Sequence, residues 1–190
     1  KGELLVKEGD LIVRLNQDPV SQFIMAFNRK DRSYSHAGIV VFENNEPFVL
    51  HIINDEEKPG GFIRKEPMAK FCDPRKNMTF GLFRYTLSND EVVALMNILQ
   101  QWRKQGVSFD TGFDLRTNDR MYCSEMIAKA LAISSNNRVK IKTTLPEKWE
   151  ARLFSIHTGL PFEFTKNNPV IAIDDLYNVA GCTRIFEARF

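Results

Sequence analysis

Long hydrophobic runs are missing from this sequence of 190 residues. A transmembrane helix needs about 18 or more consecutive apolar residues, and no segment comes near that length, so we predict a chain without a membrane span. A large excess of positive or negative charge is missing too, because the chain has 26 Lys and Arg and 24 Asp and Glu residues. The basic residues are scattered along the chain rather than clustered. Nothing in this pattern predicts a nucleic-acid partner.

Cysteine is scarce, with Cys72, Cys123 and Cys182 far apart in the chain. An odd number of cysteines without a close pair argues against a disulfide framework, and the spacing matches no zinc motif. We therefore predict at least one free thiol, no metal and no cofactor. The chain starts at Lys1 rather than methionine, so we expect that a preceding segment has been removed, either a signal peptide or a length set by cloning.

The length suits one domain covering residues 1–190, and 15 phenylalanines supply ample material for a core. Hydrophobic patterning predicts a mixture of strands and helices without regular alternation of the two, which indicates an α+β fold with a mainly antiparallel sheet. The predicted strands are 11–15, 36–43, 47–53, FIRKEP, MTFGLFRYT and CTRIFEARF; the predicted helices are 19–28, a long one between SNDE and Gly106, 122–133 and a short one near 146–154.

Two of the three histidines lie in the apolar segment RSYSHAGIVVFENNEPFVLHII. If Asn44 and Asn45 form a two-residue hairpin loop, antiparallel pairing places His51 opposite Gly38 and makes it a diagonal neighbour of His36 on the same face. Gly38 has no side chain and leaves room beside His51. A four-residue loop predicts the same register, whereas a three-residue loop puts the two histidines on opposite faces.

The hairpin by itself leaves two interpretations open. The ordinary one is a pair of core histidines, each hydrogen-bonded to a backbone group, since buried polar side chains need partners. The other is one half of an active site whose second half lies elsewhere in the chain. A metal site with two histidines needs at least one further ligand, and this segment offers no convincing one.

The segment NDRMYCSEMIAKAL places Cys123 at the start of a helix. The apolar residues that follow Cys123 at positions i+3, i+4, i+7 and i+8 are Met126, Ile127, Ala130 and Leu131, so Cys123 is predicted on the sheet-facing side. A helix N-terminus and a neighbouring imidazolium both lower the pKa of a thiol. A cysteine, a histidine and an orienting third group form the catalytic arrangement of cysteine hydrolases. The alternative is a small core cysteine.

No such motif surrounds the remaining cysteines or the third histidine. Cys72 and Cys182 do not stand at a helix start, and His157 lies in FSIHTGL without a partner motif. We predict structural roles for all three.

Four motifs in a fixed order, GDLIV, YSHAGIVV, PFVLH and FDTGFDLRTNDRMYCSE, resemble the circularly permuted NlpC-type papain-like proteins. The likeness is to the YiiX-like branch in particular, a fold-level relative of lecithin:retinol acyltransferase. The motifs span roughly residues 8–133, with the histidine motif before the cysteine motif, the reverse of classical papain-like enzymes. The resemblance implies a permuted papain-like fold in which the nucleophile helix packs against the central sheet.

The resemblance also implies roles for individual residues. Cys123 would be the nucleophile, His36 the general base, and the residue at position 51 a polar orienting group. A glutamate is usual there in the YiiX-like pattern, whereas this chain has His51, as other NlpC-type branches do. We expect the backbone N–H of Cys123 to hold the oxyanion and Tyr122 to shape that part of the site.

The resemblance implies a thiol hydrolase that cleaves a peptide amide, with cell-wall peptides among the expected substrates, through a Cys-His-His site. Two alternatives stay open: a lipid acyl hydrolase or acyltransferase using the same site, and a ligand-binding protein that kept the fold without turnover. The expected partner is a small peptide or a lipid-like acyl substrate, and the expected location is the bacterial periplasm or cell envelope. The sequence does not predict an oligomeric state.

Overall fold

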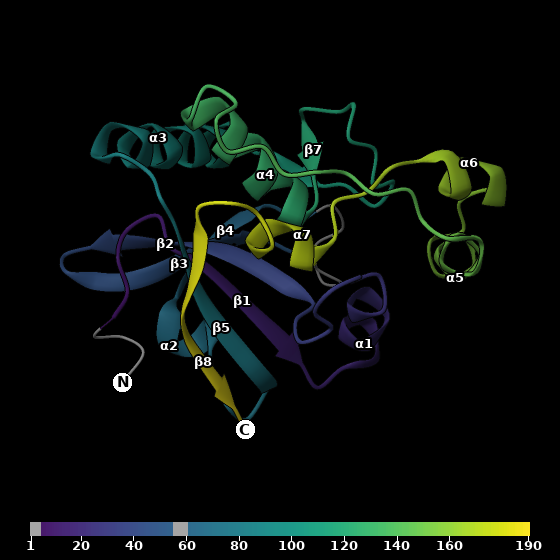
Figure 1. Cartoon of the computed structure of the whole chain (residues 1–190), viewed down its shortest axis with the longest axis horizontal. Helices are drawn as coiled ribbons and strands as arrows, with labels where there is room; N and C mark the ends of the chain where they lie inside the picture. Colours follow the sequence, from purple (N-terminus) through teal and green to yellow (C-terminus); the bar gives the residue numbers. More distant parts are fainter. Residues whose placement is uncertain (1–4, 55–60) are drawn as a thin grey trace.

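A six-stranded antiparallel sheet forms the centre of the computed structural model, which describes residues 5–54 and 61–190 (Figure 1). Its strand order is β4-β3-β2-β1-β5-β8, so the first strand of the chain lies in the interior of the sheet. The strands are β1 (Leu11–Asn16), β2 (His36–Glu43), β3 (Glu46–Ile52), β4 (Ile63–Pro67), β5 (Asn77–Tyr85) and β8 (Cys182–Arg189). The predicted α+β class with an antiparallel sheet is confirmed.

The hairpin between β2 and β3 has the two-residue loop that the sequence predicted. Asn44 and Asn45 both have positive φ, 52° and 64°, a conformation that asparagine tolerates and that tight hairpin turns require. The register runs from Ile39 opposite Leu50 to Glu43 opposite Glu46. This register places the side chains of His36 and His51 on one face of the sheet.

Two helices begin at the caps that the sequence predicted. α1 (Pro19–Met25) has Asp18 as its N-cap, and the Asp18 carboxylate accepts a hydrogen bond of 2.9 Å from the Ser21 backbone N–H. α3 (Asn89–Gln105) begins with the reciprocal Ser88 and Glu91 capping box and ends at Gly106, whose φ is 73°. Both ends follow the ordinary rules for satisfying unpaired backbone groups at helix termini.

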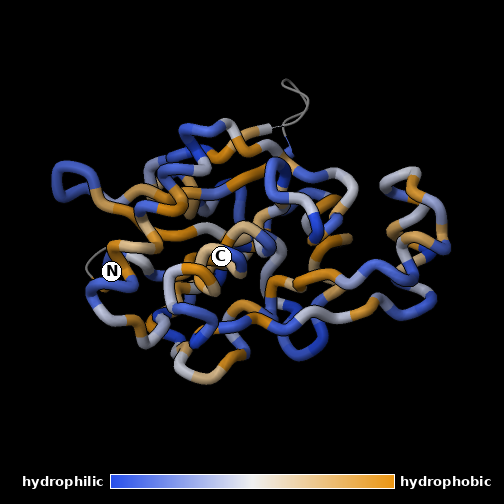
Figure 2. Tube along the Cα trace, turned by 90° about the horizontal axis from the view of Figure 1, so that it is seen from above, coloured by the Kyte–Doolittle hydropathy of each residue, from blue (hydrophilic) through white to orange (hydrophobic). Residues whose placement is uncertain are grey.

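Each face of the sheet is covered by helices. On one face α3 and α4 (Cys123–Ser134) pack on the larger core, which includes Leu11, Ile39 and Leu50. On the other face the short helix α2 (Met68–Phe71) packs on a smaller core with Ile12, Val40 and Val49. Successive residues of β1, β2 and β3 belong to the two cores in turn, because side chains along a strand point alternately to its two faces. Hydrophobic residues lie mostly in the interior and hydrophilic ones in projecting loops (Figure 2).

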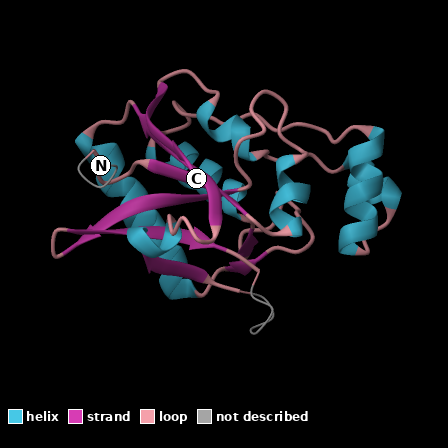
Figure 3. Cartoon of the chain, turned by 90° about the horizontal axis from the view of Figure 1, so that it is seen from below, coloured by secondary structure: helices cyan, strands magenta, loops and turns pink. Residues whose placement is uncertain are grey.

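Several short elements were not predicted from the sequence. They are α2, α6 (Phe162–Asn167), α7 (Ile173–Tyr177) and the parallel pair β6 (Ser108–Phe109) and β7 (Arg120–Met121). α5 (Lys148–Thr158) extends beyond the predicted short helix. α5 and α6 pack on each other at one end of the molecule, away from the sheet (Figure 3). No helix in the described part of the chain is long and apolar enough to cross a membrane.

Candidate active site

Cys123 is the first residue of α4, at the predicted helix start, and Tyr122 is the N-cap rather than the first helical residue that the sequence predicted. The first backbone N–H groups of a helix have no partner within the helix, so this end of α4 presents free donors next to the thiol. The side chain is 8% exposed and belongs to the core between α4 and the sheet. The structure therefore places the predicted nucleophile at a helix start, against the strands that carry the histidines.

Cys123 and His36 line the same cavity, which has a volume of about 690 Å³. His36 is the first residue of β2, so its side chain lies where the strand enters the sheet. The thiol of Cys123 is hydrogen-bonded by the backbone of Ala37, the residue that follows His36. Two segments that are far apart in the chain thus meet at one wall of the cavity.

His36 and His51 are directly hydrogen-bonded, with 2.9 Å between Nε2 of His36 and Nδ1 of His51. Both side chains are at most 9% exposed. Gly38 permits this approach, because a Cβ atom at that position would lie 3.1 Å from the Cβ of His51 and 2.3 Å from Cγ1 of Val49. The bond occupies Nε2 of His36, so any contact of this ring with the thiol has to use Nδ1.

Sequence reasoning missed Glu66 on β4. His51 lies opposite Arg64 in the register of β3 and β4, so Glu66 is a diagonal neighbour of His51 on the same face. Oε2 of Glu66 lies 3.4 Å from Nε2 of His51, and Oε1 lies 3.0 Å from the ammonium group of Lys70. These contacts hold the pKa of the Glu66 carboxyl down at about 2, with the His51 hydrogen bond as the largest cause. A carboxylate therefore reaches the site from a strand that the motifs did not include.

Arg14 lines the cavity and is a second residue that the motifs did not single out. It lies opposite His36 in the pairing of β1 with β2. Its guanidinium donates a hydrogen bond of 2.9 Å to the carbonyl oxygen of Phe71, lies 4.1 Å above the Phe71 ring, and is 3.9 Å from the Glu66 carboxylate. Arginine stays charged in proteins, so a fixed positive charge stands beside the two histidines.

Burial and this positive charge decide the protonation states of the site. Desolvation lowers the pKa of His36 well below its usual value, and the charge of Arg14 lowers it further. The pKa of His51 is also lowered, chiefly by burial, although Glu66 opposes the shift. Burial raises the pKa of the Cys123 thiol to about 11, against the opposing effect of the backbone groups of Ala37, Ser124 and Cys123 itself. Both shifts favour the neutral thiol and the neutral imidazole over the thiolate and imidazolium that a helix start alone predicts.

Tyr122 is buried and lines the cavity beside Cys123. Its hydroxyl oxygen accepts a hydrogen bond of 2.8 Å from the backbone N–H of Ile171, and its ring lies 4.9 Å from that of Phe113. Burial raises the pKa of this phenol well above its usual value. Tyr122 thus ties the start of α4 to the chain segment before α7.

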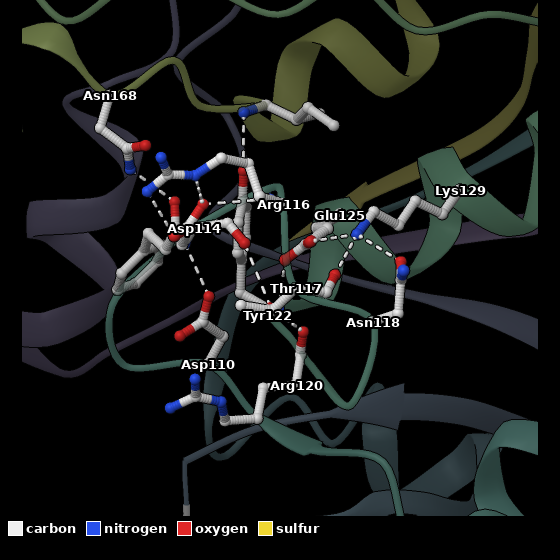
Figure 4. Close-up of polar contacts among 12 residues, drawn as sticks. Asp110, Asp114, Arg116, Thr117, Asn118, Arg120, Tyr122, Glu125, Lys129 and Asn168 are labelled. Atoms are coloured by element: carbon white, nitrogen blue, oxygen red, sulfur yellow. Dashed lines mark hydrogen bonds and ion pairs between the residues drawn. The ribbon is translucent and has the colours of Figure 1, made fainter.

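The loop that precedes α4 is held by its own polar side chains (Figure 4). The carboxylate of Asp110 accepts hydrogen bonds from the backbone N–H groups of Gly112 and Asp114, at 2.8 and 2.6 Å. The Asp114 carboxylate pairs with Arg116 at 2.7 Å. Within α4, Glu125 pairs with Lys129 at 2.8 Å. These residues order the approach to Cys123, and they do not line the cavity.

The far wall of the cavity is aromatic. Phe23 of α1 and Phe27, two residues after this helix, lie against Phe154 of α5, with centroids 6.3 and 5.6 Å from the Phe154 ring. The Phe113 ring lies 4.6 Å from that of Phe154. His157 stacks on Phe23 at 4.4 Å and also lines the cavity. The structural role predicted for His157 is therefore a place in this wall. No local motif pointed to it, because α1 and α5 meet only in the folded chain.

A family model described as the permuted papain-like amidase enzyme, YaeF/YiiX, C92 family, matches residues 5–171. A crystal structure of the metalloprotein yiiX from Escherichia coli O157:H7 is similar, with a TM-score of 0.78 at 16% sequence identity over 98% of this chain and 99% of that chain. This likeness confirms the permuted papain-like fold. No curated protein matches the chain. That E. coli protein is described as a metalloprotein, whereas in residues 5–54 and 61–190 of this chain no three His, Cys, Asp or Glu side chains are grouped to hold a metal ion.

Proposed function

Because the chain belongs to the family of permuted papain-like amidases, a family of cysteine peptidases, we propose that it cleaves an amide bond in a small peptide. Cys123 is the nucleophile, His36 is the general base and His51 is the orienting group. The observation that carries the proposal is the cavity shared by Cys123 and His36, in which His36 is hydrogen-bonded to His51 at 2.9 Å.

The reaction begins from the neutral pair. As the Cys123 sulfur attacks the substrate carbonyl, its proton passes to Nδ1 of His36, and a C–S bond forms. The imidazolium then returns this proton to the leaving nitrogen as the C–N bond breaks, which releases the amine. Water, deprotonated by His36, attacks the thioester, and the carboxylic acid leaves as the thiol regains its proton. His51 keeps the His36 ring in the required orientation at each step.

The oxyanion of the tetrahedral intermediates would be held at the start of α4. The backbone N–H of Cys123 lies in the first turn of α4, where N–H groups have no partner within the helix and the helix dipole favours negative charge. We propose that Tyr122 shapes this part of the site through its bond to Ile171.

The aromatic wall supports a second candidate, a lipid acyl hydrolase or acyltransferase with the same catalytic residues. Phe23, Phe27, Phe113 and Phe154 give the cavity an apolar side that fits an acyl chain as well as an apolar peptide side chain. The two candidates share the nucleophile and differ only in the group that the cavity accepts.

A substrate panel of short amino-acid amides and acyl esters separates the candidates. We expect amide turnover that disappears in Cys123→Ala and falls at least a hundredfold in His36→Ala. Cys182→Ala is the matched control, because Cys182 is a half-buried thiol on β8 that does not line the cavity. Turnover of esters alone would favour the lipid candidate.

The remaining alternative is a ligand-binding protein without turnover. Alkylation of Cys123 at pH 6, followed by peptide mapping, tests it. If His36→Ala leaves the alkylation rate of Cys123 unchanged, His36 does not activate the thiol and the enzymatic proposal is wrong. We also propose a location in the bacterial cell envelope, where cell-wall peptides are available, and fractionation of cells that express the full-length protein tests this.

A further inference from the structure

A carboxylate stands at the end of the hydrogen-bonded histidines. His51 uses Nδ1 to contact His36, and its other ring nitrogen, Nε2, is shielded from solvent and makes no hydrogen bond of ordinary length with the described residues. The Glu66 carboxylate oxygen lies 3.4 Å from this nitrogen. A buried N–H needs an acceptor, and Glu66 is placed to supply it.

We propose that Glu66 is a positioning residue of the active site, and that Cys123, His36, His51 and Glu66 act as a four-member chain. This inference rests on the proposed function. Glu66 does not touch the reacting atoms, because two imidazole rings separate it from the thiol. It acts by deciding which nitrogen of each ring carries the proton.

The position of the proton on each imidazole ring follows from the Glu66 end of this hydrogen-bonded series. A carboxylate accepts and cannot donate, so Nε2 of His51 carries the proton and Nδ1 of His51 is unprotonated. The 2.9 Å bond to His36 must then be donated by Nε2 of His36. A neutral imidazole carries one proton, so Nδ1 of His36 is left as a base with a free lone pair. This is the nitrogen that the proposed mechanism needs.

The surroundings keep Glu66 in place and ionised. The ammonium group of Lys70 lies 3.0 Å from its other oxygen, and the guanidinium of Arg14 lies 3.9 Å from the oxygen that faces His51. The Glu66 side chain is 17% exposed. The contact to His51 is longer than the usual N–H···O distance of about 2.7–3.2 Å. Catalytic hydrogen bonds are often long without substrate and shorten in the complex, and positive charge that develops on the rings during the reaction strengthens this one.

The expected effect of removing Glu66 is on the rate, with little effect on substrate binding. In Glu66→Ala, His51 can donate from Nδ1, and His36 then loses its unprotonated Nδ1. We expect kcat to fall at least tenfold with KM nearly unchanged, and Glu66→Asp to recover part of the loss. Glu43→Gln is the matched control, because Glu43 is a carboxylate on β2 that pairs with a β4 lysine, Lys65, whereas Glu66 lies beside His51.

Nitrogen-15 NMR of the histidines tests the inference independently of turnover. The chain has three histidines, so each ring can be assigned from His→Ala variants. We expect His36 and His51 both to be protonated at Nε2 in the native protein and in Glu43→Gln, and this pattern to be lost in Glu66→Ala. If Glu66→Ala keeps both the tautomers and kcat, Glu66 has no positioning role.

The activity of Cys123→Ala, together with the histidine tautomers, separates this inference from the proposed function. If Cys123→Ala retains activity, the proposed function fails, and the tautomers still report whether Glu66 orients the rings. If Cys123→Ala is inactive and the native rings are not protonated at Nε2, the function stands and the role of Glu66 is wrong. A circular dichroism melt of Glu66→Ala shows whether the variant is folded, and Glu66→Gln replaces it if it is not.

Discussion

Nε2 of His36 lies 2.9 Å from Nδ1 of His51, and this bond joins the first residue of β2 to a residue near the end of β3. The hairpin register puts both rings on one face of the sheet. Gly38 has no side chain between them, so the two rings can approach each other. The bond joins the two buried rings and occupies Nε2 of His36, so only Nδ1 of that ring is left for a further partner.

Removal of His51 tests this pairing. We expect His51→Ala to lower kcat/KM by on the order of a hundredfold, because general acid–base catalysis depends on an oriented ring. His51→Asn should recover part of the activity, since a side-chain carbonyl can accept the hydrogen bond from His36. Steady-state kinetics on the best amide substrate measures both variants. Wild-type activity in His51→Ala would show that His36 needs no partner.

Gly38→Ala tests the close approach of the strands. The added methyl group would lie 2.3 Å from Cγ1 of Val49, so the variant must shift β3 and with it His51. We expect a loss of about 1–3 kcal/mol in the free energy of unfolding together with reduced kcat. In the double variant with Val49→Ala the clash is relieved, so the combined loss should be smaller than the sum of the single losses. Additive losses in denaturant titrations would contradict this account.

The acid limit of activity should lie below pH 6.5. Burial and Arg14 lower the pKa of His36 well below that value, so the ring stays neutral and able to accept the thiol proton as the pH falls through 6.5. We expect kcat/KM to be level from pH 8 to 6 and to decline only at lower pH. In Arg14→Met the positive charge is gone, the pKa of His36 rises and the decline should move to higher pH. An unmoved acid limit would show that Arg14 does not act on His36.

Glu125 should make stability depend on pH in an unusual direction. Burial raises the pKa of its carboxyl to about 7 from 4.5, so between these values the folded chain holds a proton that the unfolded chain has released. Stability therefore falls as the pH rises from 4.5 through 7. Glu125→Gln cannot ionise and still accepts from the Tyr122 N–H, so we expect it to be more stable than the native protein at pH 8, by roughly 1–3 kcal/mol, and similar at pH 5.

Glu91 is the matched control for Glu125, because it has the same place in the capping box of α3. Its carboxyl is bound by Arg138, which lowers its pKa to about 2, and the sign is reversed: stability is present above the unfolded value of 4.5 and is lost as the pH falls towards 2. Glu91→Gln should therefore lower the melting temperature at pH 8. Thermal melts at pH 5 and 8 that show the same trend for both variants would contradict the burial argument.

Much of the site follows from local rules in the sequence. Asn44 and Asn45 predict a tight hairpin, the hairpin sets the register, and the register places His36, His51 and Gly38 relative to one another. The apolar spacing after Cys123 predicts a helix with that cysteine at its start. Each step depends on residues that are close in the chain, where turn geometry and helix periodicity act strongly.

The sequence by itself determined the six strands of the central sheet, the main helices, the hairpin and the roles proposed for Cys123, His36 and His51. Only the tertiary structure decided that Glu66 reaches His51. The connection from β3 to β4 is too long for a turn to set their register, and packing sets it instead. Tertiary structure also brought Arg14 beside His36 and α5 against α1. The pKa shifts also depend on the tertiary structure, because desolvation depends on everything that surrounds a group. Burial raises the pKa of the Cys123 thiol by more than the backbone groups around it lower it.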